Sequence, residues 1–93
     1  MINNNLTIKN NTLYFGGKST VELAQKYGTP IYVMDEPTIR ENCRKYVRAM
    51  KKHFGAESFP LFASKALCFK RIYEIMKEEE MGIDLVSSGE IYT

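Results

Sequence analysis

Apolar and polar positions along the chain predict short strands first and alternating strands and helices afterwards. Residues 6–15 alternate loosely between apolar and polar around Asn10-Asn11, which predicts two short strands or a hairpin. Ser19 and Glu22 then match a capping box and predict a short helix that ends near Gly28. The N-terminal part is therefore expected to be a strand-rich lead-in.

The remaining pattern changes repeatedly between strand-like and helix-like periods. The predicted elements are a strand over 29–34, a helix over 36–54 capped by Asp35, a strand over 59–63, a helix that begins near Phe69 and ends at Gly82, a strand over 83–86 and the opening of a helix at Gly89. Because strands alternate with helices through short connections, we expect an α/β protein with a parallel sheet of βα units.

Composition and charge narrow the classes of function. The 93 residues carry a net charge of +2 with interspersed signs, whereas nucleic-acid binding needs a clustered basic face. No apolar run approaches the roughly 18 residues that cross a bilayer, and Met1–Asn5 has no signal-peptide character. Cys43, Cys68 and His53 lack the spacing of a metal site. We therefore expect a cytoplasmic protein with no nucleic-acid, membrane or metal partner.

Lys65 is the first residue whose position suggests chemistry. It follows the apolar run that ends at Ala63, where α/β sheets and barrels place their active sites. Side chains alternate along a strand, so Leu61, Ala63 and Lys65 would share a face, and desolvation there would lower the pKa of the lysine. The neutral amine that Schiff-base chemistry requires would then be available. The alternative, which the pattern alone favours, is a lysine that extends into solvent at a strand end.

Asp84 is the second such residue, because it lies between Ile83 and Leu85 in a predicted strand. A carboxylate in that position is costly unless it is paired. If the two strands are neighbours, Asp84 could lie toward the same interior as Lys65 and pair with it. A carboxylate at an exposed sheet edge is an equally good interpretation.

Three further features have mainly structural interpretations. Glu90 is expected in the first turn of a helix capped by Ser88, where an acidic side chain suits the helix dipole. Cys68 follows Lys65 by three residues, but without a histidine nearby in the sequence we expect a buried, inert thiol. The acidic run 78–80 is expected to be a solvated helix face.

Three segments of the chain resemble a known family. Residues 62–66, Phe-Ala-Ser-Lys-Ala, resemble the Tyr-Ala-x-Lys-Ala stretch of the alanine-racemase-like enzymes, which use pyridoxal 5′-phosphate on a (β/α)8 barrel. Residues 82–90 resemble the Gly-x-Asp-Val-x-Ser-x-Gly-Glu stretch of the same family. Residues 27–36 resemble the Gly-Thr-Pro-Leu-Tyr-Val-Tyr-Asp stretch of the diaminopimelate decarboxylases within it. The chain departs from the commonest family pattern at Phe62, Ser64 and Leu67.

The resemblance implies both a fold and an activity. The fold is the start of a pyridoxal-phosphate-binding (β/α)8 TIM barrel, with residues 1–35 as a lead-in that packs with a C-terminal β-domain and residues 36–93 as the first βα units. Lys65 would carry the cofactor and be catalytic, Asp84 would be a nearby active-site carboxylate, and Glu90 would belong to the cofactor pocket. A full-length homodimer would decarboxylate the amino acid meso-2,6-diaminopimelate to L-lysine, whereas residues 1–93 alone would be inactive.

Three alternatives remain open at this point. Another decarboxylase on the same fold would act on ornithine, arginine or carboxynorspermidine, and Gly28-Thr29-Pro30 argues weakly against it. A non-catalytic pyridoxal-phosphate-binding barrel protein would lack the strand-rich lead-in. In a generic α/β fragment, Lys65 and Asp84 would be incidental.

Overall fold

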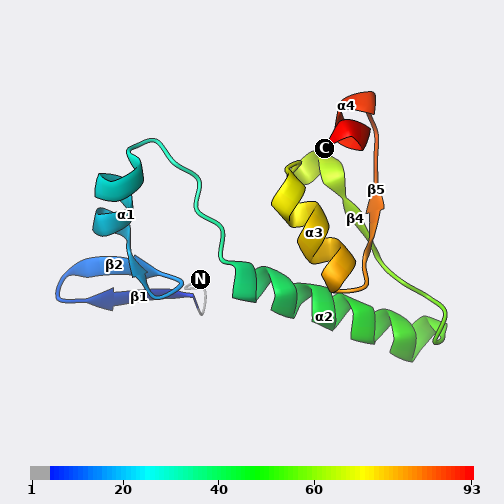
Figure 1. Cartoon of the computed structure of the whole chain (residues 1–93). Coiled ribbons are helices and arrows are strands. Elements are labelled where there is room, and N and C mark those ends of the chain that lie inside the picture. The colour runs from blue at the N-terminus through cyan, green and yellow to red at the C-terminus, as the bar shows by residue number, and fades with distance from the viewer. Residues whose placement is uncertain (1–4) are drawn as a thin grey trace. The chain divides into compact units, whose positions relative to one another are not determined.

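The structure, a computed structural model, describes residues 5–93 and has two compact units, the first ending at Thr38 and the second covering Ile39–Thr93. The first unit contains β1 (Leu6–Lys9), β2 (Thr12–Phe15), β3 (Lys18–Ser19) and α1 (Thr20–Tyr27) (Figure 1). The boundary falls in the first turn of α2 (Glu36–Phe54). The roles that the sequence predicts for parts 1–35 and 36–93 stay predictions. The absence of a signal peptide was inferred from Met1–Asn5, of which the first four residues lie outside the described part.

The predicted hairpin and first helix are confirmed. β1 pairs with β2 and β2 with β3, all antiparallel. Asn10 and Asn11 have φ values of 48° and 63°, as a two-residue type I′ turn requires. The Ser19 hydroxyl accepts a hydrogen bond from the Glu22 N–H at 3.3 Å, which caps α1 as predicted. Gly28, with φ 82°, ends the helix.

The strand predicted over residues 29–34 is wrong. This segment is extended but has no strand character, and most of its side chains are exposed, Tyr32 at 97%. A strand exists only when a neighbour accepts and donates its backbone hydrogen bonds. No other segment of residues 5–93 pairs with it, so its β-rich composition alone does not form a strand.

The second unit contains the predicted parallel pair of strands. Its elements after α2 are β4 (Leu61–Ala63), the 3₁₀ turn η1 (Ser64–Ala66), α3 (Lys70–Glu78), β5 (Gly82–Asp84) and α4 (Ser88–Tyr92). β4 and β5 are parallel, with Phe62 opposite Ile83. The buried residues of the core are Cys43 of α2 and Ile72, Ile75 and Met76 of α3, against which Phe62 and Ile83 pack. One face of the two-stranded sheet is therefore covered by helices.

Helix α3 ends at Glu78, earlier than the predicted end at Gly82. The N–H of Met81 bonds to the carbonyl of Met76 at 2.8 Å, and the N–H of Glu80 bonds to that of Lys77 at 3.2 Å. This is a Schellman motif, and Glu80 takes the left-handed position with φ 62°. Gly82 is instead the first residue of β5. Because this position usually holds glycine, the glutamate there gave no sequence signal for the end of α3.

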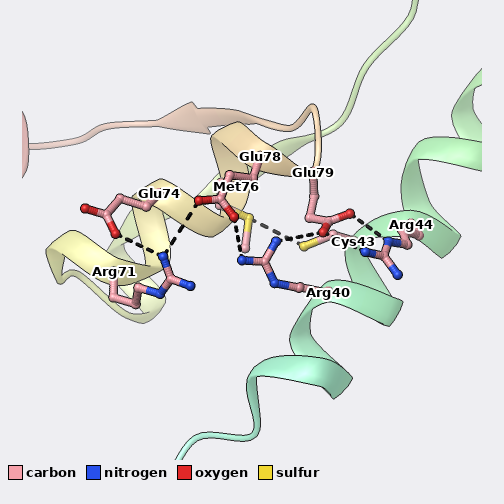
Figure 2. Close-up of polar contacts among 8 residues, drawn as sticks. All are labelled: Arg40, Cys43, Arg44, Arg71, Glu74, Met76, Glu78 and Glu79. Atoms are coloured by element: carbon pink, nitrogen blue, oxygen red, sulfur yellow. Dashed lines mark hydrogen bonds and ion pairs between the residues drawn. The ribbon is translucent and has the colours of Figure 1, made fainter.

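The acidic run at the end of α3 is only in part the solvated face expected for it, because Glu78 and Glu80 are exposed and Glu79 is not. Figure 2 shows Glu78 and Glu79 opposite Arg40 and Arg44 of α2. The Glu79 side chain is only 9% exposed and accepts hydrogen bonds from Arg40 and from the Arg44 Nε, both at 2.8 Å. Glu78 also pairs with Arg40. These ion pairs join α2 to α3 alongside the buried core and fix the end of the connection that leads into β5.

Stability should depend on pH through Glu79. The Arg44 hydrogen bonds, followed by those of Arg40, hold the pKa of this carboxyl below its usual range. Its contribution is therefore complete above the unfolded-state pKa of about 4.3 and is lost as pH falls through the lower folded-state value. We expect Glu79→Gln to lower the Tm of the full-length protein by several degrees at pH 7. Thermal denaturation between pH 7 and pH 3.5 should show the difference from wild type shrinking.

The matched control is Glu41→Gln. Glu41 forms an i,i+4 pair with Lys45 at 3.5 Å in which both side chains are 64% exposed, and such surface pairs contribute little. Its Tm should equal that of wild type across the pH range. A Glu79→Gln difference that stays constant down to pH 3.5 would contradict the assignment.

Candidate active site

The carboxyl ends of β4 and β5 bring together the two residues that the sequence singled out. Strands β4 and β5 lie side by side (Figure 1). Ala63, the last residue of β4, lies opposite Asp84, the last residue of β5. Residues directly opposite in a sheet point to the same face, so Asp84 shares the face of Ala63. Lys65 follows two residues later in η1. The prediction that the two strands are neighbours is confirmed. Lys65 and Asp84 lie at the same end of the sheet.

This face is the one that the helices leave uncovered. Leu61, Ala63 and Asp84 are all exposed, whereas Phe62 and Ile83 on the opposite face pack against the core. In a closed barrel, a strand face that does not pack on helices lines the interior. The face that carries Leu61, Ala63 and Asp84 is therefore the one that would line the interior of a barrel.

The expected local geometry of Lys65 needs correction. The strand ends at Ala63, and the 3₁₀ turn breaks the alternation that was to carry the lysine onto the face of Leu61. Lys65 is exposed, and so is Asp84. Within residues 5–93, neither side chain forms a hydrogen bond or an ion pair, so the predicted Lys65–Asp84 pair is not formed. The desolvation inferred from strand alternation requires a covered face, which these residues do not supply.

Glu90 lies in α4, the helix that follows β5, and is only 7% exposed. Its Oε2 accepts hydrogen bonds from the Val86 N–H at 3.1 Å and the Ser87 hydroxyl at 2.8 Å. Its own N–H donates to Ser87 Oγ at 3.3 Å. Ser87, not Ser88, therefore caps α4 in a reciprocal capping box. The Ser-x-x-Glu spacing of residues 87–90 was a sufficient signal for this cap.

A set of hydroxyl groups and a thiol continues from Glu90 to the Lys65 turn. Ser64 is fully buried and its hydroxyl is hydrogen-bonded to the hydroxyl of Tyr73 in α3. The same phenol lies 3.2 Å from Cys68 Sγ, which donates to Thr93 Oγ1 at 3.4 Å. Cys68 is exposed, so the expectation that it is buried is wrong. The side-chain hydrogen bonds with Thr93 and then Tyr73 lower the pKa of its thiol.

The Ser64 hydroxyl is also the main group that lowers the pKa of Glu90, ahead of Ser87. The sequence analysis missed Ser64 and Tyr73 as site residues. Ser64 was noted only as a departure from the family pattern, and Tyr73 lay unremarked within the helix predicted to begin near Phe69. A single buried serine leaves no periodic signal, and the pairing with Tyr73 depends on how η1 meets α3.

The chemistry of this end of the sheet fits a cofactor that is attached through an aldehyde. Lys65 offers an exposed primary amine that no carboxylate in the described part engages, and Asp84 offers a carboxylate at the same end of the sheet. Between residues 5 and 93, no cluster of three or more potential ligands could hold a metal ion. Nor does any helix in that range have the length and apolar character needed to cross a membrane.

Comparison with known proteins identifies relatives of this chain, although no family model matches it. The diaminopimelate decarboxylase of Methanothermobacter thermautotrophicus is 49% identical over 82 residues, which cover 87% of this chain and 19% of that protein. The diaminopimelate decarboxylase of Methanocaldococcus jannaschii is 36% identical over 93 residues, covering 97% and 21%.

The fold agrees with the sequence match. The crystal structure of the M. jannaschii diaminopimelate decarboxylase in complex with L-lysine has a TM-score of 0.80 at 32% identity, covering 97% of this chain and 21% of that chain. The chain thus spans about one fifth of the length of these relatives. In sequence and in fold, this chain is similar to part of the diaminopimelate decarboxylases, which have an alanine-racemase-like barrel.

Proposed function

We propose that these residues form the start of a pyridoxal-phosphate-dependent enzyme that decarboxylates meso-2,6-diaminopimelate to L-lysine. The observation that carries this proposal is the position of Lys65 and Asp84 at the carboxyl ends of two adjacent parallel strands. The relatives that share this sequence and fold support it. A homodimer in the cytoplasm, with no nucleic-acid or membrane partner, is part of the same proposal.

Lys65 would hold the cofactor through its amine, and Asp84 and Glu90 would belong to the cofactor pocket. When bound, pyridoxal phosphate supplies an electron sink for the electron pair that remains when a carboxylate leaves as carbon dioxide. The exposed Lys65 amine can exchange with the amine of an incoming amino acid. The Asp84 carboxylate favours a positively charged nitrogen at this end of the sheet. Glu90 would hold the turn between β5 and α4, since its carboxylate accepts hydrogen bonds from residues 86–87.

The substrate is tested by comparing kcat/KM for carbon dioxide release by the full-length protein. We expect meso-diaminopimelate to exceed ornithine, arginine, lysine and carboxynorspermidine, because residues 28–35 resemble the diaminopimelate decarboxylases in particular. Ornithine preferred by about tenfold, or roughly 1.4 kcal/mol of transition-state stabilisation, would assign the protein to another decarboxylase of this fold. Tight binding of the cofactor, with no carbon dioxide released from any of these amino acids, would favour the non-catalytic alternative.

A further inference from the structure

The turn that carries Lys65 is attached to α3, the helix that follows β4. Ser64, immediately before Lys65, is 0% exposed and hydrogen-bonds to the Tyr73 hydroxyl of α3. A serine side chain is short, so the hydrogen bond that holds its hydroxyl also restrains the backbone of η1. The Ser64 hydroxyl also lowers the pKa of the Glu90 carboxyl of α4, which is consistent with this placement.

Glu90 restrains the segment that follows the second strand. Its Oε2 accepts hydrogen bonds from the N–H of Val86 and the hydroxyl of Ser87, shortly after the strand that ends at Asp84. The other oxygen, Oε1, is buried and has no hydrogen-bond partner among residues 5–93. Glu90 therefore restrains the chain just after Asp84 through one carboxylate oxygen.

We propose that Ser64 and Tyr73 are positioning residues that hold the Lys65 amine at the same end of the sheet as Asp84, while Glu90 restrains the segment after Asp84. The proposal rests on the function proposed above and deepens it. None of the three side chains needs to touch the substrate. The Ser64–Tyr73 hydrogen bond restrains the lysine turn against α3, and the hydrogen bonds of Glu90 restrain residues 86–87.

The hydrogen bond between the hydroxyls of Ser64 and Tyr73 is the contact that a test of positioning must remove. Tyr73→Phe removes this hydrogen bond and keeps the ring that packs against the core. It is therefore the cleanest test of positioning.

The test uses the full-length protein with Tyr73→Phe and Ser64→Ala, and Tyr46→Phe as the matched control. Tyr46 is an exposed tyrosine of α2 with no part in this network. The readouts are the pH titration of the visible absorbance of bound pyridoxal phosphate, the Kd of the cofactor, kcat, KM and Tm. The titration reports the environment of the lysine that carries the cofactor, independently of turnover.

For Tyr73→Phe and Ser64→Ala we expect the titration midpoint to move by at least about 0.5 pH units, equal to about 0.7 kcal/mol. We also expect kcat to fall by about tenfold or more with KM within about twofold, whereas Tyr46→Phe matches wild type. An unchanged midpoint and kcat in Tyr73→Phe, with or without a lower Tm, would overturn the proposal. If Ser64→Ala fails to fold, Tyr73→Phe decides.

Failure of the proposed function gives a different result. A wild-type protein that binds the cofactor but decarboxylates none of the amino acids refutes the activity, and the titration and the Kd still measure positioning. In that case a shifted midpoint in Tyr73→Phe supports the network, and an unshifted one refutes it. A wild-type protein with no cofactor absorbance at all overturns both proposals.

Discussion

Replacing Lys65 by alanine in the full-length protein should reduce kcat for meso-diaminopimelate by several orders of magnitude, because the amine that attaches the cofactor covalently is lost. The exposed position of Lys65 in a short turn makes a large loss of stability unexpected. Carbon dioxide release measures the activity. Borohydride reduction of the cofactor-loaded protein, followed by digestion and peptide mapping, identifies the attachment site in wild type.

Lys70→Ala is the control for this experiment. Lys70 is exposed, begins α3 five residues after Lys65, and takes no part in the site. Its activity and labelling should match wild type. A reduced cofactor label found on Lys26, Lys70 or another lysine, with Lys65 unlabelled, would refute the assignment.

Asp84→Asn should lower kcat by about 10²–10³, the range typical of removing one group that stabilises charge in an active site. Asparagine keeps the size of the side chain but loses the negative charge at this end of the sheet. Because Asp84 is exposed at the end of β5 and its side chain forms no hydrogen bond within residues 5–93, the Tm should stay close to that of wild type. The absorbance of the bound cofactor should titrate at a changed pH.

Glu57→Gln provides the comparison, since it removes one negative charge from an exposed loop residue of the same unit. Its kinetics and absorbance should not change. An Asp84→Asn protein with wild-type kinetics and titration would show that this carboxylate is an ordinary surface group.

The helices of this chain are well predicted where their ends carry local signals. The sequence places a helix over 36–54 and the structure has the same bounds, because Asp35 and Gly55 mark its two ends and an apolar stripe lies between them. The parallel pairing of β4 with β5 follows from the alternation of strands and helices. These features depend on neighbours in the sequence, which a single chain displays.

Features that depend on distant partners were predicted poorly. Residues 29–34 have strand composition but no strand beside them in the described part. Glu79 looked solvated because Arg40 and Arg44 lie more than thirty residues away. Ser64 gave no signal because its partner, Tyr73, comes from a separate element, α3. The candidate site was found through Lys65 and Asp84, whereas the groups behind it were visible only in three dimensions.

The pairing of Ala63 with Asp84 limits which changes in chain length this segment can accept during evolution. Because successive strand residues face opposite sides, a one-residue slip of β5 would place Ile83 on the open face and turn the carboxylate of Asp84 toward the apolar core. Point substitutions between residues 67 and 81 leave this register intact. A single insertion or deletion within Gly82–Asp84 would exchange the two faces. Related sequences should therefore vary in composition along α3 while keeping the length of β5 constant.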